Sequence, residues 1–428
     1  MAKTFREWDP AQAWLLPPSV KDLVPEGHLA HFVGDTVRQE IDLEPILAAY
    51  AEERGYPPYH PALMTALLLY GYCRGVYSSR AIARACEERV DFMAVTGREA
   101  PDFRTIAAFR SRHVAALRGI FVDIVRLCRE AGLVTLGHVA LDGTKVRANA
   151  SKHKAMSYER MGKEERRLKT EVQAWLDRAG AADTREDKEH GQDRRGDELP
   201  EWVKSKEERR AKIQEAREAL EAKAKEEAEK EKRPPKPPAP TSQRNFTDPE
   251  SRILKTSEGF IQGYNAQAAV DAGSQVIVAQ DVVAQQNDAP MLEPMLVQIR
   301  ENTGRLPREL SADRGYLSES NLSAIARRRV RGYIATGRQR HGSASATSSP
   351  ELHPGPRAAA MRARLRRGGH RSRYRLRKIT AEPVFGQVKG ARGFRQFLLR
   401  GLEAVRGEWS LIAAAHNLLK LANARAMA

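Results

Sequence analysis

Apolar residues recur three and four positions apart from His28 to about Gly132, which is the pattern of helices that bury one face. Pro61 can begin an apolar helix that runs through Tyr72, and Ser78-Ser79 can cap a helix over Arg80 to Val90. Asp102 to Thr105 can cap a long helix that runs to Glu130. The pattern predicts an all-α N-terminal part, residues 1–132, compatible with a helix-turn-helix-like module and equally with a plain helical scaffold.

The pattern changes to that of strands at Leu133. His138-Val139-Ala140-Leu141 is a short apolar run, and the polar group Asp142-Gly143-Thr144-Lys145 follows it. We therefore expect residues 133–150 to contain a buried strand that carries a carboxylate at its tip.

Strand-like and helical patterns alternate again over residues 243–400. Extended segments are expected over Ser251 to Lys255, Gly259 to Val270, Ser274 to Val283, Leu310 to Asp313 and Gly332 to Ala335. Helices are expected between them, over Ala289 to Arg300 and Glu319 to Arg328, and at the end of the chain over Leu402 to Ala424, within residues 401–428. The order predicts a mixed α/β fold.

Residues 151–242 interrupt this α/β pattern. Leu168 to Leu176 and Ile213 to Leu220 give modest helical signals. Lys223 to Arg233 has almost nothing to bury, so it is either a solvated charged helix or disordered, and Pro234 to Pro240 is typical of a linker. We interpret the segment as a charged helical insertion in the α/β domain.

Positive charge is concentrated in one part of the chain. The 428 residues include 72 Lys and Arg and 55 Asp and Glu, a net charge of +17, and Asn321 to Ala381 alone carries sixteen basic residues and one acid. A surface of this kind attracts a polyanion, most often nucleic acid. It would contact phosphates with a steep salt dependence and would not read bases.

The remaining composition narrows the class of protein. The three cysteines are an odd number with no CxxC pair, so neither a disulfide framework nor a cysteine zinc site is expected. Free cysteines of this kind fit the reducing environment of the cytosol. No apolar run is long enough to span a bilayer, and no secretory signal precedes the first helix, which predicts a soluble intracellular protein. The sequence also has no Walker phosphate loop, GxGxxG, GxSxG or HExxH motif.

Three carboxylates lie where chemistry is expected. Asp142 and Asp313 each follow a predicted strand, and Glu382 precedes Pro383 at the expected start of a helix. Such positions can converge at one edge of a sheet, and three carboxylates suit Mg²⁺ or Mn²⁺. Two such ions about 4 Å apart can serve phosphodiester cleavage. Taken alone, however, each acid is more often a solvated surface residue.

The sequence around these acids resembles that of the DDE transposases of bacterial insertion sequences, and the resemblance covers nearly the whole chain. In the N-terminal part the matching residues are His60-Pro61-Ala62-Leu63-Met64, Ser78-Ser79-Arg80-Ala81-Ile82 and Pro101-Asp102-Phe103-Arg104-Thr105-Ile106. Later they are Leu141 to Lys145, Thr247 to Ser251, Gly263 to Gln267, Ala312 to Tyr316, Glu382 to Lys389, Arg392 to Phe394 and Ala415 to Leu418.

The resemblance implies a fold and an activity. The fold would be an all-α domain, for DNA binding or assembly, followed by a ribonuclease H-like α/β domain. The activity would be cleavage at the terminal inverted repeats of the element and joining of the 3′-hydroxyl to target DNA. The resemblance further implies two Mg²⁺ or Mn²⁺ ions, a homodimer or larger assembly on double-stranded DNA, and a place in the bacterial cytoplasm at the nucleoid.

The resemblance also assigns roles to residues. Asp142, Asp313 and Glu382 would be the metal-binding triad. Near the third acid, such transposases have a Tyr-Arg-Glu-Lys signature. By this resemblance Tyr374, Arg377 and Lys389 would bind DNA, and Lys389 would also be a catalytic residue. Arg375, Lys378 and Arg392 would add DNA contacts, although Arg375, Arg377 and Lys378 could equally supply only diffuse charge.

Two alternatives remain open on the sequence. Four residues separate Arg377 from Glu382 where related groups often have three, so Lys378 is an alternative functional cation. His341 to Gly369 is less well patterned than its surroundings, as in a degenerate copy. The alternatives to a transposase are an inactive or domesticated DNA-binding copy and a metal-dependent nuclease without strand transfer.

Overall fold

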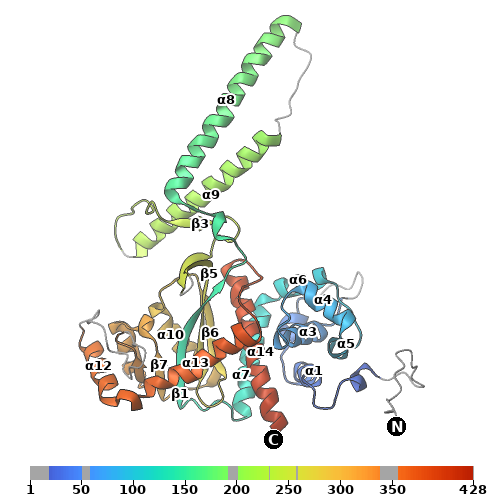
Figure 1. The fold of residues 1–428 in the computed structure, drawn as a ribbon, viewed down its shortest axis with the longest axis vertical. Coiled ribbons are helices and arrows are strands. Elements are labelled where there is room, and N and C mark those ends of the chain that lie inside the picture. Colours follow the sequence, from blue (N-terminus) through green and yellow to red (C-terminus); the bar gives the residue numbers. More distant parts are fainter. Residues whose placement is uncertain are drawn as a thin grey trace, which may run out of the picture.

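The computed structural model describes residues 19–50, 58–190, 201–230, 232–256, 259–337 and 355–427. The first hundred of these form a bundle of short helices (Figure 1). The helices are α1 (Leu29–Gln39), α2 (Glu44–Leu47), α3 (Pro61–Cys73), α4 (Ser79–Glu88), α5 (Val90–Thr96), α6 (Phe103–Arg112) and α7 (Val114–Glu130).

The long helix expected from Asp102 to Glu130 is two helices. Asp102 does cap α6, because its side chain accepts hydrogen bonds from the backbone N–H groups of Arg104 and Thr105. The helix ends at His113, whose φ of −106° and ψ of 23° lie outside the helical region. The buried His113 ring stacks on Tyr50, and its Nε2 lies 3.2 Å from the Tyr50 hydroxyl, a contact that periodicity does not show.

A mixed six-stranded sheet follows the bundle. Its strands are β1 (His138–Arg147), β4 (Arg252–Thr256), β5 (Gly259–Asp271), β6 (Ile277–Val283), β7 (Glu309–Ala312) and β8 (Arg331–Ile334). The order is β4-β5-β1-β7-β8, and β6 also pairs with β5. β1 is antiparallel to β5 and parallel to β7, which is parallel to β8.

Helices cover this sheet on both sides. They are α10 (Leu292–Thr303), α11 (Glu319–Arg327), α12 (Pro356–Gly368), α13 (Leu376–Gly386) and α14 (Leu402–Met427). α14 contacts β6 on one side and α3 and α7 on the other, so it packs the helical bundle onto the sheet (Figure 1). This arrangement is the ribonuclease H-like α/β fold with a helical N-terminal region that the sequence predicts.

Two long helices project from the sheet. α8 (Tyr158–His190) and α9 (Glu201–Lys230) stand on a small two-stranded antiparallel sheet of β2 (Ala155–Ser157) and β3 (Gln243–Asn245) (Figure 1). They share a separate apolar cluster, composed of Met156, Met161, Leu168, Ile213, Ala216 and Leu220. Of the two alternatives for the charged segment after Lys223, the helix is observed up to Lys230. We call residues 158–230 the arm.

Candidate active site

Asp142 and Asp313 lie side by side because of the register of two parallel strands. The last residue pair in the register of β1 and β7 is Leu141 with Ala312, and the residue that follows on each side is an aspartate. Neighbouring strands in a sheet are about 4.8 Å apart. Asp142 is buried and Asp313 is half-buried, at the edge where β7 ends.

The expectation that Asp142 lies at the tip of a strand is wrong. β1 continues to Arg147, because β5 pairs with it from Val139 to Arg147 after β7 has ended. The polar residues Gly143, Thr144 and Lys145 are half-buried in this part of the strand. What terminates at Asp142 is the pairing with β7, and that opens the sheet edge at the carboxylate.

Glu382 lies within α13, and the expectation that it opens a helix is also wrong. α13 begins at Leu376, and Pro383 lies inside it. Because proline has no N–H, the carbonyl of Ile379 lacks its helical donor. The side-chain amide of Gln275 donates to that carbonyl at 3.1 Å, which lets the helix pass through the proline.

Arg377 joins two of the three acids. Its Nη1 lies 2.6 Å from Oδ2 of Asp142, and its Nη2 lies 3.1 Å from Oε1 of Glu382. The Arg377 Nε is buried and has no hydrogen-bond partner among the described residues. Of the two candidate cations, Arg377 therefore contacts the acids, whereas Lys378 is exposed to solvent.

Burial makes the two aspartates costly to ionise. Loss of hydration raises the pKa of Asp142 to about 7, with a further increase from the charge of Asp313, while Arg377 lowers it. Burial also raises the pKa of Asp313, and Asp288 adds to that increase. Carboxylates that repel each other in this way are stabilised by a bound cation.

The donor set fits a divalent metal such as Mg²⁺, since it consists of carboxylates without sulfur or imidazole. Within the ranges that the structure describes, no group of three or more His, Cys, Asp or Glu side chains converges closely enough to hold an ion. Asp142 and Asp313 are adjacent, whereas the contact of Asp142 with Glu382 runs through Arg377.

A fourth carboxylate, Asp288, was missed by sequence reasoning. Its Oδ1 accepts hydrogen bonds from Nδ2 of Asn265 at 2.6 Å and Nε2 of Gln267 at 2.8 Å. A Cβ on Gly143 would lie 3.1 Å from this Oδ1 and 2.7 Å from Nε2 of Gln267. Asp288 follows no strand directly and belongs to a turn, so the search for acids at strand ends could not find it.

Asn265 and Gln267 are neutral side chains whose hydrogen bonds hold the site together. Both donate to Asp288, and Gln267 also accepts from the hydroxyl of Tyr316, which is fully buried. Phe394 is likewise a core residue.

The predicted DNA-binding residues lie in three environments. Tyr374 is buried with its ring 6.0 Å from Arg377 Cζ, and Lys389 Nζ donates to the Lys145 carbonyl at 2.6 Å, so both lie beside the triad. Arg375 is exposed to solvent, as Lys378 is. Arg392 lies elsewhere: its carbonyl accepts from the Tyr77 hydroxyl, and its Nη2 lies 3.2 Å from Nδ1 of His416.

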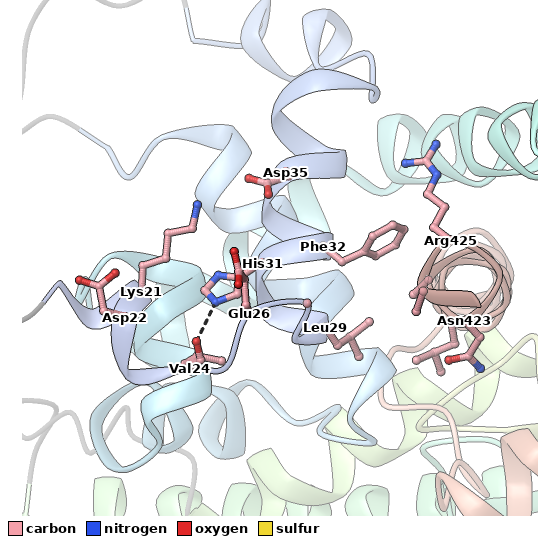
Figure 2. Close-up of a pocket in the computed structure, with 14 residues that line it drawn as sticks. Lys21, Asp22, Val24, Glu26, Leu29, His31, Phe32, Asp35, Asn423 and Arg425 are labelled. Carbon is pink, nitrogen blue, oxygen red and sulfur yellow. Dashed lines mark hydrogen bonds between the residues drawn. The ribbon is translucent and has the colours of Figure 1, made fainter. Parts of the chain in front are cut away.

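A cavity of about 960 Å³ lies apart from these acids, between α1 and the end of α14 (Figure 2). Its lining mixes Lys21, His31, Arg425 and three acids, and it includes no member of the triad. In Figure 2, Lys21 and Asp22 lie on the side of this cavity opposite Arg425. We assign it no part in the chemistry.

Two family models match the chain. Residues 18–112 match the family described as Transposase domain (DUF772), and residues 238–418 match the family described as Transposase DDE domain. No curated protein and no solved structure is significantly similar to the chain. The sheet, its edge acids and these matches define a transposase enzyme with a ribonuclease H-like catalytic domain. The chain belongs to the DDE transposases of insertion sequences.

Two general properties follow from membership in this family. Transposases of this class act on DNA in transposition, and the family generally uses divalent metal ions. Separately, no helix among the described residues is long and apolar enough to cross a membrane.

Proposed function

We propose that the chain cuts the DNA ends of its own insertion sequence and joins each exposed 3′-hydroxyl to target DNA. The observation that carries the proposal is the convergence of Asp142 and Asp313 at one sheet edge, with Glu382 tied to Asp142 through Arg377. We further propose that these three acids hold two Mg²⁺ or Mn²⁺ ions. When bound, such ions activate an attacking oxygen and stabilise the leaving oxygen of a phosphodiester.

The basic residues around the triad would orient the DNA. The positive charge of Arg377, held between Asp142 and Glu382, would attract a phosphate, and Lys389 adds a point charge from the turn that follows α13. Exposed arginines of α12, namely Arg357, Arg364, Arg366 and Arg367, extend the positive surface beyond the site. These contacts position the duplex without reading its sequence.

Assembly and location follow by analogy with the family. Pairing of two element ends requires at least two copies of the chain on double-stranded DNA, and we propose a homodimer or larger assembly. We place it at the bacterial nucleoid, where its DNA substrate is.

The test uses labelled duplexes from the ends of the element that encodes the chain, incubated with Mg²⁺ or Mn²⁺. We expect Asp142→Asn to abolish cleavage while DNA binding measured without metal stays within about twofold, because the amide removes a metal-binding charge but keeps an oxygen that can accept from Arg377. Asp177→Asn, on the arm, is the matched control and should cleave normally. Specific 3′-hydroxyl ends and joined products from the wild type support the proposal.

Other outcomes select the alternatives. Cleavage without joined products would indicate a nuclease, and binding without cleavage by the wild type would indicate an inactive copy. Cleavage retained by Asp142→Asn would remove Asp142 from the triad.

A further inference from the structure

A second basic surface lies directly beside the triad. It is a cavity of about 490 Å³ lined by Gly143, Thr144, Lys145, Lys255, Thr256, Gln286 and Lys389, which we call the lysine groove. Gly143 follows Asp142 in β1, and Lys389 lies seven residues after Glu382. One end of the groove therefore lies next to Asp142 along β1.

The lining of the lysine groove is built for anions. Three of its seven residues are lysines and none is acidic. Two acids lie beside Gly143 at one end of the groove: Asp142, whose Oδ1 accepts from the Gly143 N–H at 3.0 Å, and Asp288, whose Oδ1 is held by Asn265 and Gln267. The hydroxyl groups of Thr144 and Thr256 and the amide of Gln286 add neutral donors.

Backbone carbonyls fix two of the ammonium groups in place. Lys389 Nζ donates to the carbonyl of Lys145 at 2.6 Å, and Lys145 Nζ donates in turn to the carbonyl of Lys255. An ammonium group has three N–H donors, so each of these lysines keeps two for a ligand. Preorganisation of this kind reduces the entropy lost when an anion binds.

An exposed aromatic residue distinguishes a nucleic-acid strand from a simple anion. Phe260 is 61% exposed and is the cross-strand partner of Lys255, so the two side chains leave the same face of the β4–β5 pair. Lysines beside an exposed aromatic ring combine phosphate contacts with a surface on which a base can stack.

We propose that the lysine groove binds consecutive phosphates of a DNA strand next to the bond that is cut at the triad, with Phe260 contacting a base. The inference rests on the DNA substrate of the proposed function and adds the path that one strand takes away from the acids. Lys145 and Lys255 would be phosphate ligands that the Tyr-Arg-Glu-Lys signature does not include.

The test measures DNA affinity against salt concentration in EDTA, so it does not depend on metal binding or cleavage. The probe is a duplex from the end of the element. For Lys145→Gln/Lys255→Gln we expect the slope of log K against log salt to fall by about 1.8, since each phosphate contact on duplex DNA contributes about 0.9. Lys169→Gln/Lys212→Gln, two exposed arm lysines, is the matched control and should keep the wild-type slope.

Further variants separate the proposal from misfolding and from a free-anion site. Lys255 is exposed, so Lys255→Gln alone should fold and lower the slope by about 0.9, and Lys145→Arg/Lys255→Arg should restore it. Phe260→Ala should weaken binding of a duplex with an unpaired end more than that of a blunt duplex.

Two results would overturn the proposal. One is a wild-type slope in the double variant. The other is loss of the difference between wild type and variant when inorganic phosphate replaces chloride at constant ionic strength, which would indicate a site for free phosphate. If the slope falls as expected but the wild type never cleaves, the groove stands and the proposed catalysis fails.

Discussion

At the scale of single residues, His416 is a buried histidine with both ring nitrogens satisfied. Its Nε2 lies 2.8 Å from the carbonyl of Gln275, and its Nδ1 lies 3.2 Å from Nη2 of Arg392. A carbonyl only accepts and a guanidinium only donates, so the neutral ring must carry its proton on Nε2. His416 is thus a core residue of α14 rather than a ligand.

Protonation of His416 should destabilise the fold. Burial, with the charges of Arg392 and Lys420, lowers its pKa from 6.5 to about 3. Between these values the unfolded chain binds the proton and the folded chain does not, so this contribution to stability is present above pH 6.5 and is lost as the pH falls. At pH 5 the loss is about 2 kcal/mol, from 1.4 kcal/mol per pKa unit.

The measurement compares denaturant unfolding of wild type and His416→Gln at pH 7.5 and pH 5. We expect the variant to lose about 2 kcal/mol less than the wild type over this interval, because it lacks the titrating ring. His153→Gln, on an exposed turn, is the control. An identical pH dependence of wild type and His416→Gln would contradict the argument.

At the scale of elements, α13 depends on a contact that is remote in sequence. Gln275, in the turn between β5 and β6, donates to the Ile379 carbonyl that Pro383 leaves without a helical donor. Its Oε1 also accepts from Lys420, at 3.0 Å. Gln275 therefore fixes the helix that carries Arg377 and Glu382.

This contact predicts an energetic coupling between Gln275 and Pro383. Gln275→Ala should lower the free energy of unfolding by at least about 0.5–1.5 kcal/mol, the usual value of the one hydrogen bond to Ile379, because its Oε1 also loses the bonds from Lys420 and Gln387. In a Pro383→Ala background the cost should be smaller, because residue 383 then supplies an N–H to the same carbonyl. Denaturant unfolding of the four proteins in this double-mutant cycle measures the difference. Additive effects would mean that the two residues act independently.

The same helix shows what the sequence could and could not predict. Local patterns located the strands around Leu254, Val270 and Ile277 correctly, because alternation and β-branched residues are local signals. The proline after Glu382 favours a helix start, whereas the donor to the Ile379 carbonyl that this proline leaves unpaired is Gln275, 104 residues before Ile379 in the sequence. The continuation of β1 beyond Asp142 likewise depends on pairing with β5, which periodicity does not contain.

The candidate site divides in the same way. Motif resemblance selected Asp142, Asp313, Glu382, Arg377 and Lys389, and the fold brings these residues to one region. Asp288 and Lys255 belong to no matching motif, and Lys145 ends one in which no role is assigned to it; a turn and cross-strand contacts place these residues at the site. Tertiary pairing decides which additional polar residues join a site.

At the scale of the whole molecule, the arm is electrically different from the rest of the chain. Tyr158–His190 has eight basic and nine acidic residues, and Glu201–Lys230 has nine of each, so the helices contribute a net charge of −1 to a chain of +17. Their apolar cluster is separate from the main core. Neither observation favours a role of the arm in phosphate contacts or in stabilising the sheet.

Removal of the arm should therefore leave the catalytic domain folded and its DNA contacts unchanged. Ser157 pairs with Gln243 in the two-stranded sheet of β2 and β3, so an Asn-Gly turn can replace residues 158–242 and join the two strands as a hairpin. The shortened protein also carries Phe246→Ser, because Phe246 packs on the apolar cluster of the arm. We expect a salt-dependence slope equal to the wild-type slope, since no net positive charge is removed. We also expect the midpoint temperature of thermal unfolding of the shortened protein to stay within a few degrees of that of the wild type, because its core is intact. A smaller slope would show that arm lysines and arginines contact DNA despite the neighbouring acids, and loss of the folded sheet would show that the arm belongs to its core.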